Sequence, residues 1–248
     1  NLNLQHKDLL GAKNIRDICR IKCGSLNNQT SIYVGKQNPK TLRIIKSFLD
    51  KNPSKKYYYG KDFKIKRIKS YFLYSDNNGI LKLKAKQIHS EGLWENVALA
   101  IKVARDLNVS NKIILKSLPK IEILGRLQFI KKGKLRKLLF ANEDLLLDGC
   151  HSEKSIENHV KYIKNINKPK YAIWSLMKNR EPKKYVKYLK NFKKIVAINI
   201  PNETNACSAK LLKKIANQNS IDCEVAKDIP AAIKMISSNE DKCLSIIG

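Results

Sequence analysis

The sequence predicts an α/β protein whose second half contains a mostly parallel sheet. From residue 121 onward, short apolar strands alternate with amphipathic helices, and this alternation is typical of βαβ units. The first half instead combines amphipathic helices with a hairpin signature. With 248 residues and 43% hydrophobic content, the chain is long enough for two modest cores. We therefore predict two domains, residues 1–120 and residues 121–248.

The predicted elements of the first half rest on local signals. The triplet Asn77-Asn78-Gly79 between two alternating apolar runs is a hairpin signature. Apolar residues at i, i+3 and i+4 predict amphipathic helices elsewhere. The predicted strands cover residues 30–34, 71–74 and 80–83, and the predicted helices cover residues 40–49, 91–107 and 109–117.

The predicted strands of the second half are short and almost wholly apolar, as expected of strands covered on both faces. Ligands of such sheets bind beyond the carboxyl ends of the strands, so the residues that follow the strands are the first candidates for a site. The predicted strands cover residues 144–148, 171–175, 195–200, 221–225 and 243–247, and the predicted helices cover residues 153–166, 182–191, 207–218 and 229–237.

The chain is strongly basic, with 50 Lys and Arg against 21 Asp and Glu, a formal net charge of +29. Such a charge is typical of proteins that bind nucleic-acid phosphates. A general bias toward lysine explains it equally well, because the lysines are spread along the whole chain and occupy polar helix faces such as residues 183–190. We favour this second interpretation and do not expect nucleic acid as a partner.

The six cysteines form no Cys-x-x-Cys pair, which argues against a zinc site of the usual spacing. Because no export signal is visible, we expect free thiols in a reducing cytoplasm. No stretch approaches the ~20 apolar residues of a membrane span, so no membrane partner is expected. The chain opens on Asn1 rather than Met and is expected to be part of a longer protein.

One candidate site follows the first strand of the second half, in the segment Leu147-Asp148-Gly149-Cys150-His151-Ser152. Asp148 ends an apolar strand, where a carboxylate can bind a ribose hydroxyl, a metal or a cation. His151 precedes a predicted helix, whose N-terminus favours an anion. The alternative is that Asp148 merely caps that helix.

Three further segments contain candidate residues. Leu124-Gly125-Arg126-Leu127-Gln128 offers a guanidinium suited to phosphate, or simply one more exposed arginine. His6 is a candidate metal ligand, because imidazole often binds metals. Lys22 stands before Gly24 at a predicted helix end, where a lysine also complements the helix dipole.

Together and in this order, the segments resemble folylpolyglutamate and dihydrofolate synthases of the Mur ligase superfamily. That family has Asp-His-x-x-x-Leu-Gly, Glu-Lys-Ala-Gly-Ile, Pro-Gly-Arg-Leu-Gln and Asp-Gly-Ala-His-Asn. The corresponding segments here are Gln5-His6…Leu10-Gly11, Ile21-Lys22-Cys23-Gly24-Ser25, Leu124–Gln128 and Asp148–Ser152. Asn96 resembles the asparagine of the family's Asn-Ala-x-x-Ala helix, and Met177–Glu181 resembles a loop of the C-terminal domain.

The resemblance implies the remainder of a Mur-ligase-type central ATPase domain followed by a Rossmann-like C-terminal domain. It implies a ligase that uses ATP and Mg²⁺ to join glutamate to a folate through an acyl phosphate. In that scheme His6 is similar to a Mg²⁺ ligand and Lys22 to a carbamylated lysine. Arg126 would contact ATP phosphates, Asp148 would hold the nucleotide across the domain cleft, and His151 would lie near it.

Several departures from the family pattern concern polar site residues. No Gly-x-x-x-x-Gly-Lys-[Ser/Thr] motif occurs, so the loop that cradles ATP phosphates is missing from this sequence. Gln5 and Ile21 replace the acidic residues of the family. We therefore expect either a ligase that needs a separate P-loop-bearing fragment, or an inactive remnant or basic nucleic-acid-binding module that keeps the fold.

Overall fold

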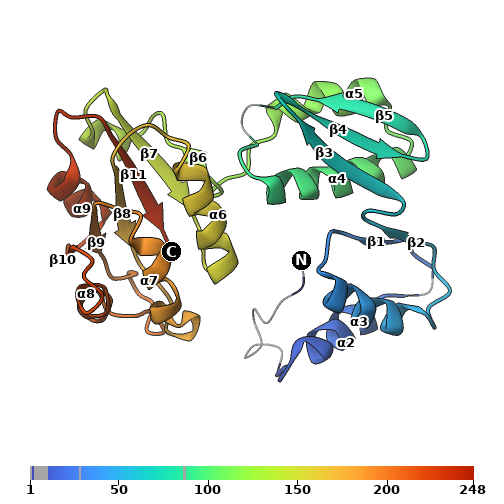
Figure 1. The fold of residues 1–248 in the computed structure, drawn as a ribbon, viewed down its shortest axis with the longest axis horizontal. Coiled ribbons are helices and arrows are strands. Elements are labelled where there is room, and N and C mark those ends of the chain that lie inside the picture. Colours follow the sequence, from blue (N-terminus) through green and yellow to red (C-terminus); the bar gives the residue numbers. More distant parts are fainter. Residues whose placement is uncertain (1, 3–10, 28, 86–87) are drawn as a thin grey trace. The chain divides into compact units, whose positions relative to one another are not determined.

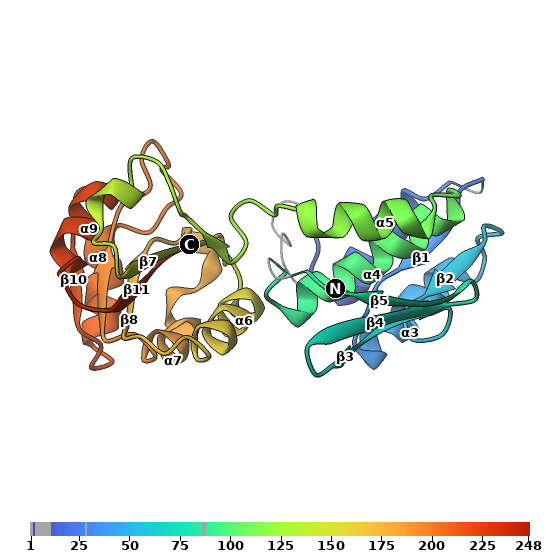
Figure 2. The ribbon, with the colours of Figure 1, turned by 90° about the horizontal axis from the view of Figure 1, so that it is seen from above.

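The computed structural model describes residues 2, 11–27, 29–85 and 88–248. His6 lies outside the described residues. The chain divides into two compact units, Asn1–Glu122 and Ile123–Gly248 (Figures 1 and 2). Within the described segments, no helix combines the length and apolar character needed to cross a membrane.

The first unit begins with two helices and a short parallel strand pair. Helix α2 (Ile15–Gly24) packs against α3 (Pro39–Leu49), and β1 (Ile32–Val34) pairs with β2 (Lys56–Tyr58). Their apolar side chains form one cluster, because each helix has a single apolar face. Its buried members are Cys19, Ile32, Val34, Ile45 and Leu49.

The starts of both helices are encoded locally. Asn14 accepts a hydrogen bond from the backbone of Asp17, whose side chain accepts in return from the Asn14 N–H, so the pair forms a capping box. Asn38 accepts from the Thr41 N–H, and Pro39 occupies the first helical position, where no donor is needed. These contacts explain why the chain enters a helix at both points.

The rest of the first unit is a three-stranded antiparallel sheet with helices packed on it. Strands β3 (Phe63–Ile68), β4 (Tyr71–Asp76) and β5 (Gly79–Leu83) lie in that order, and α4 (Glu91–Asp106) and α5 (Asn111–Ser117) complete the layer. The predicted hairpin and both predicted helices are confirmed. The buried core of this layer includes Phe63, Tyr74, Leu83, Trp94, Ala98 and Ile101.

Charged residues of α4 are buried against this sheet. The Arg105 guanidinium pairs with Asp76, whose side chain has no exposed surface. Asp76 also accepts from the Tyr74 hydroxyl at 2.6 Å. Lys102, with a side chain only 2% exposed, pairs with Asp106 at 2.6 Å. Each buried charge therefore has an opposite charge beside it, as burial requires.

Replacing Arg105 by leucine should destabilise the first unit by about 3–5 kcal/mol, because the Asp76 carboxylate would remain buried without its cation. Urea denaturation checks this through the fluorescence of Trp94, in a Trp174→Phe background that leaves a single reporter in this unit. Lys36→Ala breaks the exposed pair with Glu95 and should cost less than about 1 kcal/mol. Equal losses in the two variants would contradict the argument.

The second unit is built on a six-stranded sheet with the order β10-β9-β8-β11-β7-β6. All neighbouring pairs are parallel except β6, which runs antiparallel to β7 at the edge. This confirms the predicted α/β class with a mostly parallel sheet. The strands are β6 (Gln128–Phe129), β7 (Glu143–Asp148), β8 (Lys170–Trp174), β9 (Lys194–Ala197), β10 (Cys223–Val225) and β11 (Lys242–Ile247).

Helices cover both faces of this sheet. On one face, α6 (Glu153–Ile163), α7 (Val186–Leu189) and α8 (Ala209–Asn217) contribute to a single buried cluster. On the other face, α9 (Ile229–Ile236) packs against the strands. Neighbouring strand residues alternate between the two clusters, as the two-residue period of a strand requires.

The helix predicted over residues 182–191 is shorter in the structure. Pro182–Lys184 forms a 3₁₀ turn, and only α7 follows it as α-helix. The physical reason is that the first three residues of the predicted segment contain no apolar side chain to bury. Further 3₁₀ turns are Leu118–Lys120, Arg136–Leu138 and Lys178–Arg180.

Candidate functional site

Strand pairing at the edge of the second sheet brings two of the sequence motifs together. Gln128, the last residue of the Gly125–Gln128 motif, begins β6 and pairs with Leu147 of β7. The next residue of β7 is Asp148, where the second motif starts. Because the two strands run antiparallel, the residues before β6 lie beside the residues after β7.

Reciprocal hydrogen bonds join the two motifs. The Gly149 N–H donates to the Gly125 carbonyl at 2.8 Å, and Arg126 Nη1 donates to the Gly149 carbonyl. The Gly125 N–H donates to Gln128 Oε1 at 2.9 Å, which closes the turn. Gly125 has φ +66°, a left-handed conformation that glycine adopts without strain. The arginine is therefore fixed directly against the second motif.

His151 binds the same carbonyl as Arg126. Its Nδ1 lies 2.9 Å from the Gly149 oxygen, and since a carbonyl only accepts, Nδ1 carries the proton. Both side chains are partly exposed. A guanidinium and an imidazole thus lie around one carbonyl at the carboxyl end of β7, and the remaining N–H groups of the guanidinium suit an anionic ligand.

Helix α6 begins immediately after this segment, and its cap is Ser152 rather than Asp148. The Ser152 hydroxyl accepts from the Ser155 N–H at 3.2 Å, and the Ser155 hydroxyl accepts from the Ser152 N–H at 2.9 Å. The interpretation of Asp148 as a helix cap is therefore wrong. The carboxylate is available for another partner.

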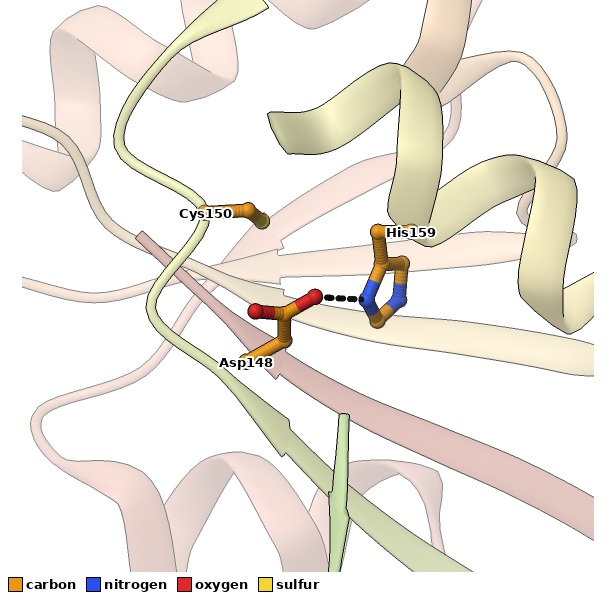
Figure 3. Close-up of side chains that lie close together, drawn as sticks. All are labelled: Asp148, Cys150 and His159. Carbon is orange, nitrogen blue, oxygen red and sulfur yellow. Dashed lines mark hydrogen bonds and ion pairs between the residues drawn. The ribbon is translucent and has the colours of Figure 1, made fainter. Parts of the chain in front are cut away.

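That partner is His159, in the middle of α6. Asp148 is 5% exposed, and its Oδ2 lies 2.9 Å from His159 Nδ1 (Figure 3). His159 has no exposed surface, and its Nε2 lies 3.0 Å from Ser245 Oγ on β11. An ionised carboxylate only accepts, so Nδ1 donates to it and a neutral ring accepts the Ser245 hydroxyl proton at Nε2. The network ties β7, α6 and β11 together.

Sequence reasoning missed His159 and Ser245. A signal was present, because His159 falls within the apolar stripe of α6 whose other buried members are Ile156, Val160 and Ile163. A histidine on an apolar face needs polar partners. Its partner Ser245 is 86 residues away in sequence, and no local pattern connects the two.

Cys150 lies beside this network and is 1% exposed. Burial and the neighbouring Asp148 carboxylate raise the pKa of the Cys150 thiol well above its usual range. The thiol is therefore protonated at neutral pH and is a poor nucleophile as it stands. All six cysteines of the chain are free, as expected.

The remaining candidates lie in the first unit. Lys22 is exposed in the last turn of α2, and Asn96 is exposed on α4. Among the described residues of the first unit, no hydrogen bond or ion pair joins Lys22 to Asn96. Their roles, like that of His6 outside the described residues, stay predictions. The direct nucleotide contact of Asp148 also stays a prediction.

No family model and no curated protein matches the sequence. Solved structures do match the fold. FolC of E. coli in complex with ADP gives a TM-score of 0.81 at 16% identity, over 100% of this chain and 57% of that chain. Folylpolyglutamate synthase of Thermotoga maritima gives a TM-score of 0.72 at 20% identity, over 93% of this chain and 54% of that chain.

The chain has the folylpolyglutamate synthase fold. The bifunctional folylpolyglutamate synthase/dihydrofolate synthase of Yersinia pestis, complexed with AMPPNP and a Mn ion, also matches, with a TM-score of 0.75 at 15% identity over 94% of this chain and 53% of that chain. The resemblance predicted from the motifs is thus confirmed at the level of fold. The chain spans little more than half the length of these folylpolyglutamate synthase structures.

Replacing His159 by leucine should destabilise the second unit by about 3–5 kcal/mol, because Asp148 would remain buried without its donor. The double variant Asp148→Asn/His159→Leu should lose less, since no charge is then left unpaired. Urea denaturation followed by Trp174 fluorescence in a Trp94→Phe background measures both. Glu157→Ala, which breaks exposed pairs on the same helix, is the control and should cost below about 1 kcal/mol. An His159→Leu loss no larger than the control's would refute the assigned network.

Proposed function

We propose that this chain is part of an ATP-dependent ligase that joins glutamate to a folate, of the folylpolyglutamate synthase/dihydrofolate synthase type. The observation that supports this most is the placement of Arg126 and His151 on the Gly149 carbonyl, at the carboxyl end of a strand in a parallel sheet. The same fold occurs in solved structures that contain ADP or AMPPNP.

The proposed reaction has two steps. ATP first phosphorylates a carboxylate of the folate, which gives an acyl phosphate and ADP. The amine of glutamate then attacks the acyl carbon, forms the amide and releases phosphate. Arg126 contributes to the first step by binding phosphate oxygens, since a guanidinium offers a planar set of N–H donors suited to phosphate. His151 is proposed to lie near the nucleotide, and Asp148 is proposed to hold the nucleotide.

Magnesium is the proposed metal, and when bound it neutralises charge on the transferring phosphoryl group. This ion prefers oxygen ligands. Lys22 offers oxygen ligands only when carbamylated, and its exposure leaves the amine accessible to CO₂. His6 is the second proposed ligand.

The phosphate cradle is proposed to come from a separate P-loop-bearing fragment, because the sequence contains no such motif. We place the enzyme in the cytoplasm.

Arg126→Ala should lower glutamate-dependent ADP release about 10²- to 10³-fold in the enzyme reconstituted with a P-loop fragment, as expected when a donor to a charged transition state is lost. A coupled ADP assay with a folate acceptor and glutamate measures this. Lys132→Ala removes an exposed cation of the same unit and should leave the rate unchanged. An unchanged rate in Arg126→Ala would reject the phosphate contact.

Residues 1–248 alone should release no ADP in the same assay, because their sequence lacks the phosphate-cradling motif. Addition of the P-loop fragment should restore glutamate-dependent release. Clear ADP release by the chain alone would contradict the proposal. No ADP release with the fragment present would instead identify the chain as a catalytically inactive remnant.

A further inference from the structure

A buried sulfur, a nitrogen and an oxygen come together under α6. The donor atoms of Asp148, Cys150 and His159 all lie within 4.8 Å of one another, and Figure 3 shows the three side chains on the inner side of α6. Their exposed fractions are 5%, 1% and 0%. We propose that these three residues form a zinc site, whose ligands differ from those proposed for magnesium and which shares Asp148 with the proposed nucleotide contact.

The ligand set decides the metal. Thiolate and imidazole ligands favour zinc, whereas magnesium and calcium prefer oxygen. Zn–S bonds of about 2.3 Å and Zn–N or Zn–O bonds of about 2.0–2.2 Å place tetrahedral ligands roughly 3.2–3.6 Å apart. The Asp148 and His159 atoms are 2.9 Å apart as a hydrogen-bonded pair, so the ion would replace that hydrogen bond and move them slightly apart. The Cys150 sulfur lies within 4.8 Å of both other donor atoms, and a small rotation of its side chain is needed to bring it to this separation.

Charge balance also favours a divalent ion at this place. A metal ion in the protein interior needs compensating charge. The Asp148 carboxylate supplies one negative charge, and Cys150 supplies the other when its thiol proton leaves for solvent. The bound ion and its ligands are then neutral overall. Three residues leave one tetrahedral position, which a water molecule can fill.

Ser245 completes the arrangement. When zinc takes Nδ1 of His159, the neutral ring carries its proton on Nε2, which then donates to the Ser245 hydroxyl at the 3.0 Å contact already present. Histidines that bind metals usually donate a hydrogen bond from their second ring nitrogen in this way, and the contact orients the ring. The serine would therefore change from donor to acceptor without moving.

Zinc content and cobalt substitution of residues 1–248 test the proposal, with the metal added either to the folded chain or during refolding. We expect about one zinc ion per chain, and a cobalt form with thiolate charge-transfer absorption and tetrahedral visible bands. Excess Mg²⁺ should leave the cobalt spectrum unchanged. Cys150→Ala and His159→Gln should abolish the signal. Ser245→Ala should weaken zinc binding about 10- to 100-fold.

Cys23→Ala is the matched control, because this half-buried cysteine lies in the first unit and should leave the signal intact. A measurement on the unmodified chain avoids any folding defect of the variants. Zinc should protect Cys150 from alkylation in partly denaturing urea, as judged by peptide mass spectrometry. Absence of the cobalt signal under both loading conditions, or a signal that survives Cys150→Ala, would overturn the proposal.

Discussion

The candidate site depends on the backbone of one residue, Gly149. Its N–H donates to Gly125 and its carbonyl accepts from Arg126 and His151. One short segment therefore fixes the turn before β6, the direction of a guanidinium and the orientation of an imidazole. Loss of the backbone position of Gly149 would release all three at once, which is why the strand pairing between β6 and β7 matters for the proposed function.

Buried residues of the second unit also hold the segment that contains Gly149. Asp148 precedes Gly149 and is bound by His159, which in turn contacts Ser245. No side-chain nitrogen or oxygen of Asp148, His159 or Ser245 is buried without a hydrogen-bond partner. A fully satisfied buried network adds rigidity where a partly satisfied one would cost stability. The partly exposed side chains of Arg126 and His151 are thus supported by a buried layer beneath them, and the proposed zinc ion would reinforce that layer.

Much of the fold could be predicted from sequence because its signals are local. The hairpin at Asn77-Asn78-Gly79 and the alternating strands and helices of the second half have turn residues and periodicities that act over a few residues. Asp148 could be singled out because it ends an apolar strand, and Arg126 because its segment resembles a motif of the family. The pairing of His159 with Ser245 could not, because the last strand, β11, lies between β7 and β8. That insertion depends on packing of the whole sheet.

Titration of ¹⁵N-labelled residues 1–248 with millimolar ADP, followed by backbone amide chemical shifts, tests most directly whether the side chains held by Gly149 contact a nucleotide. The account predicts that the largest saturable shifts centre on Gly125–Gln128 and on Gly149–Ser152, the segments joined by the Gly149 amide. Saturable shifts confined to other parts of the chain, or no shifts at all, would contradict it.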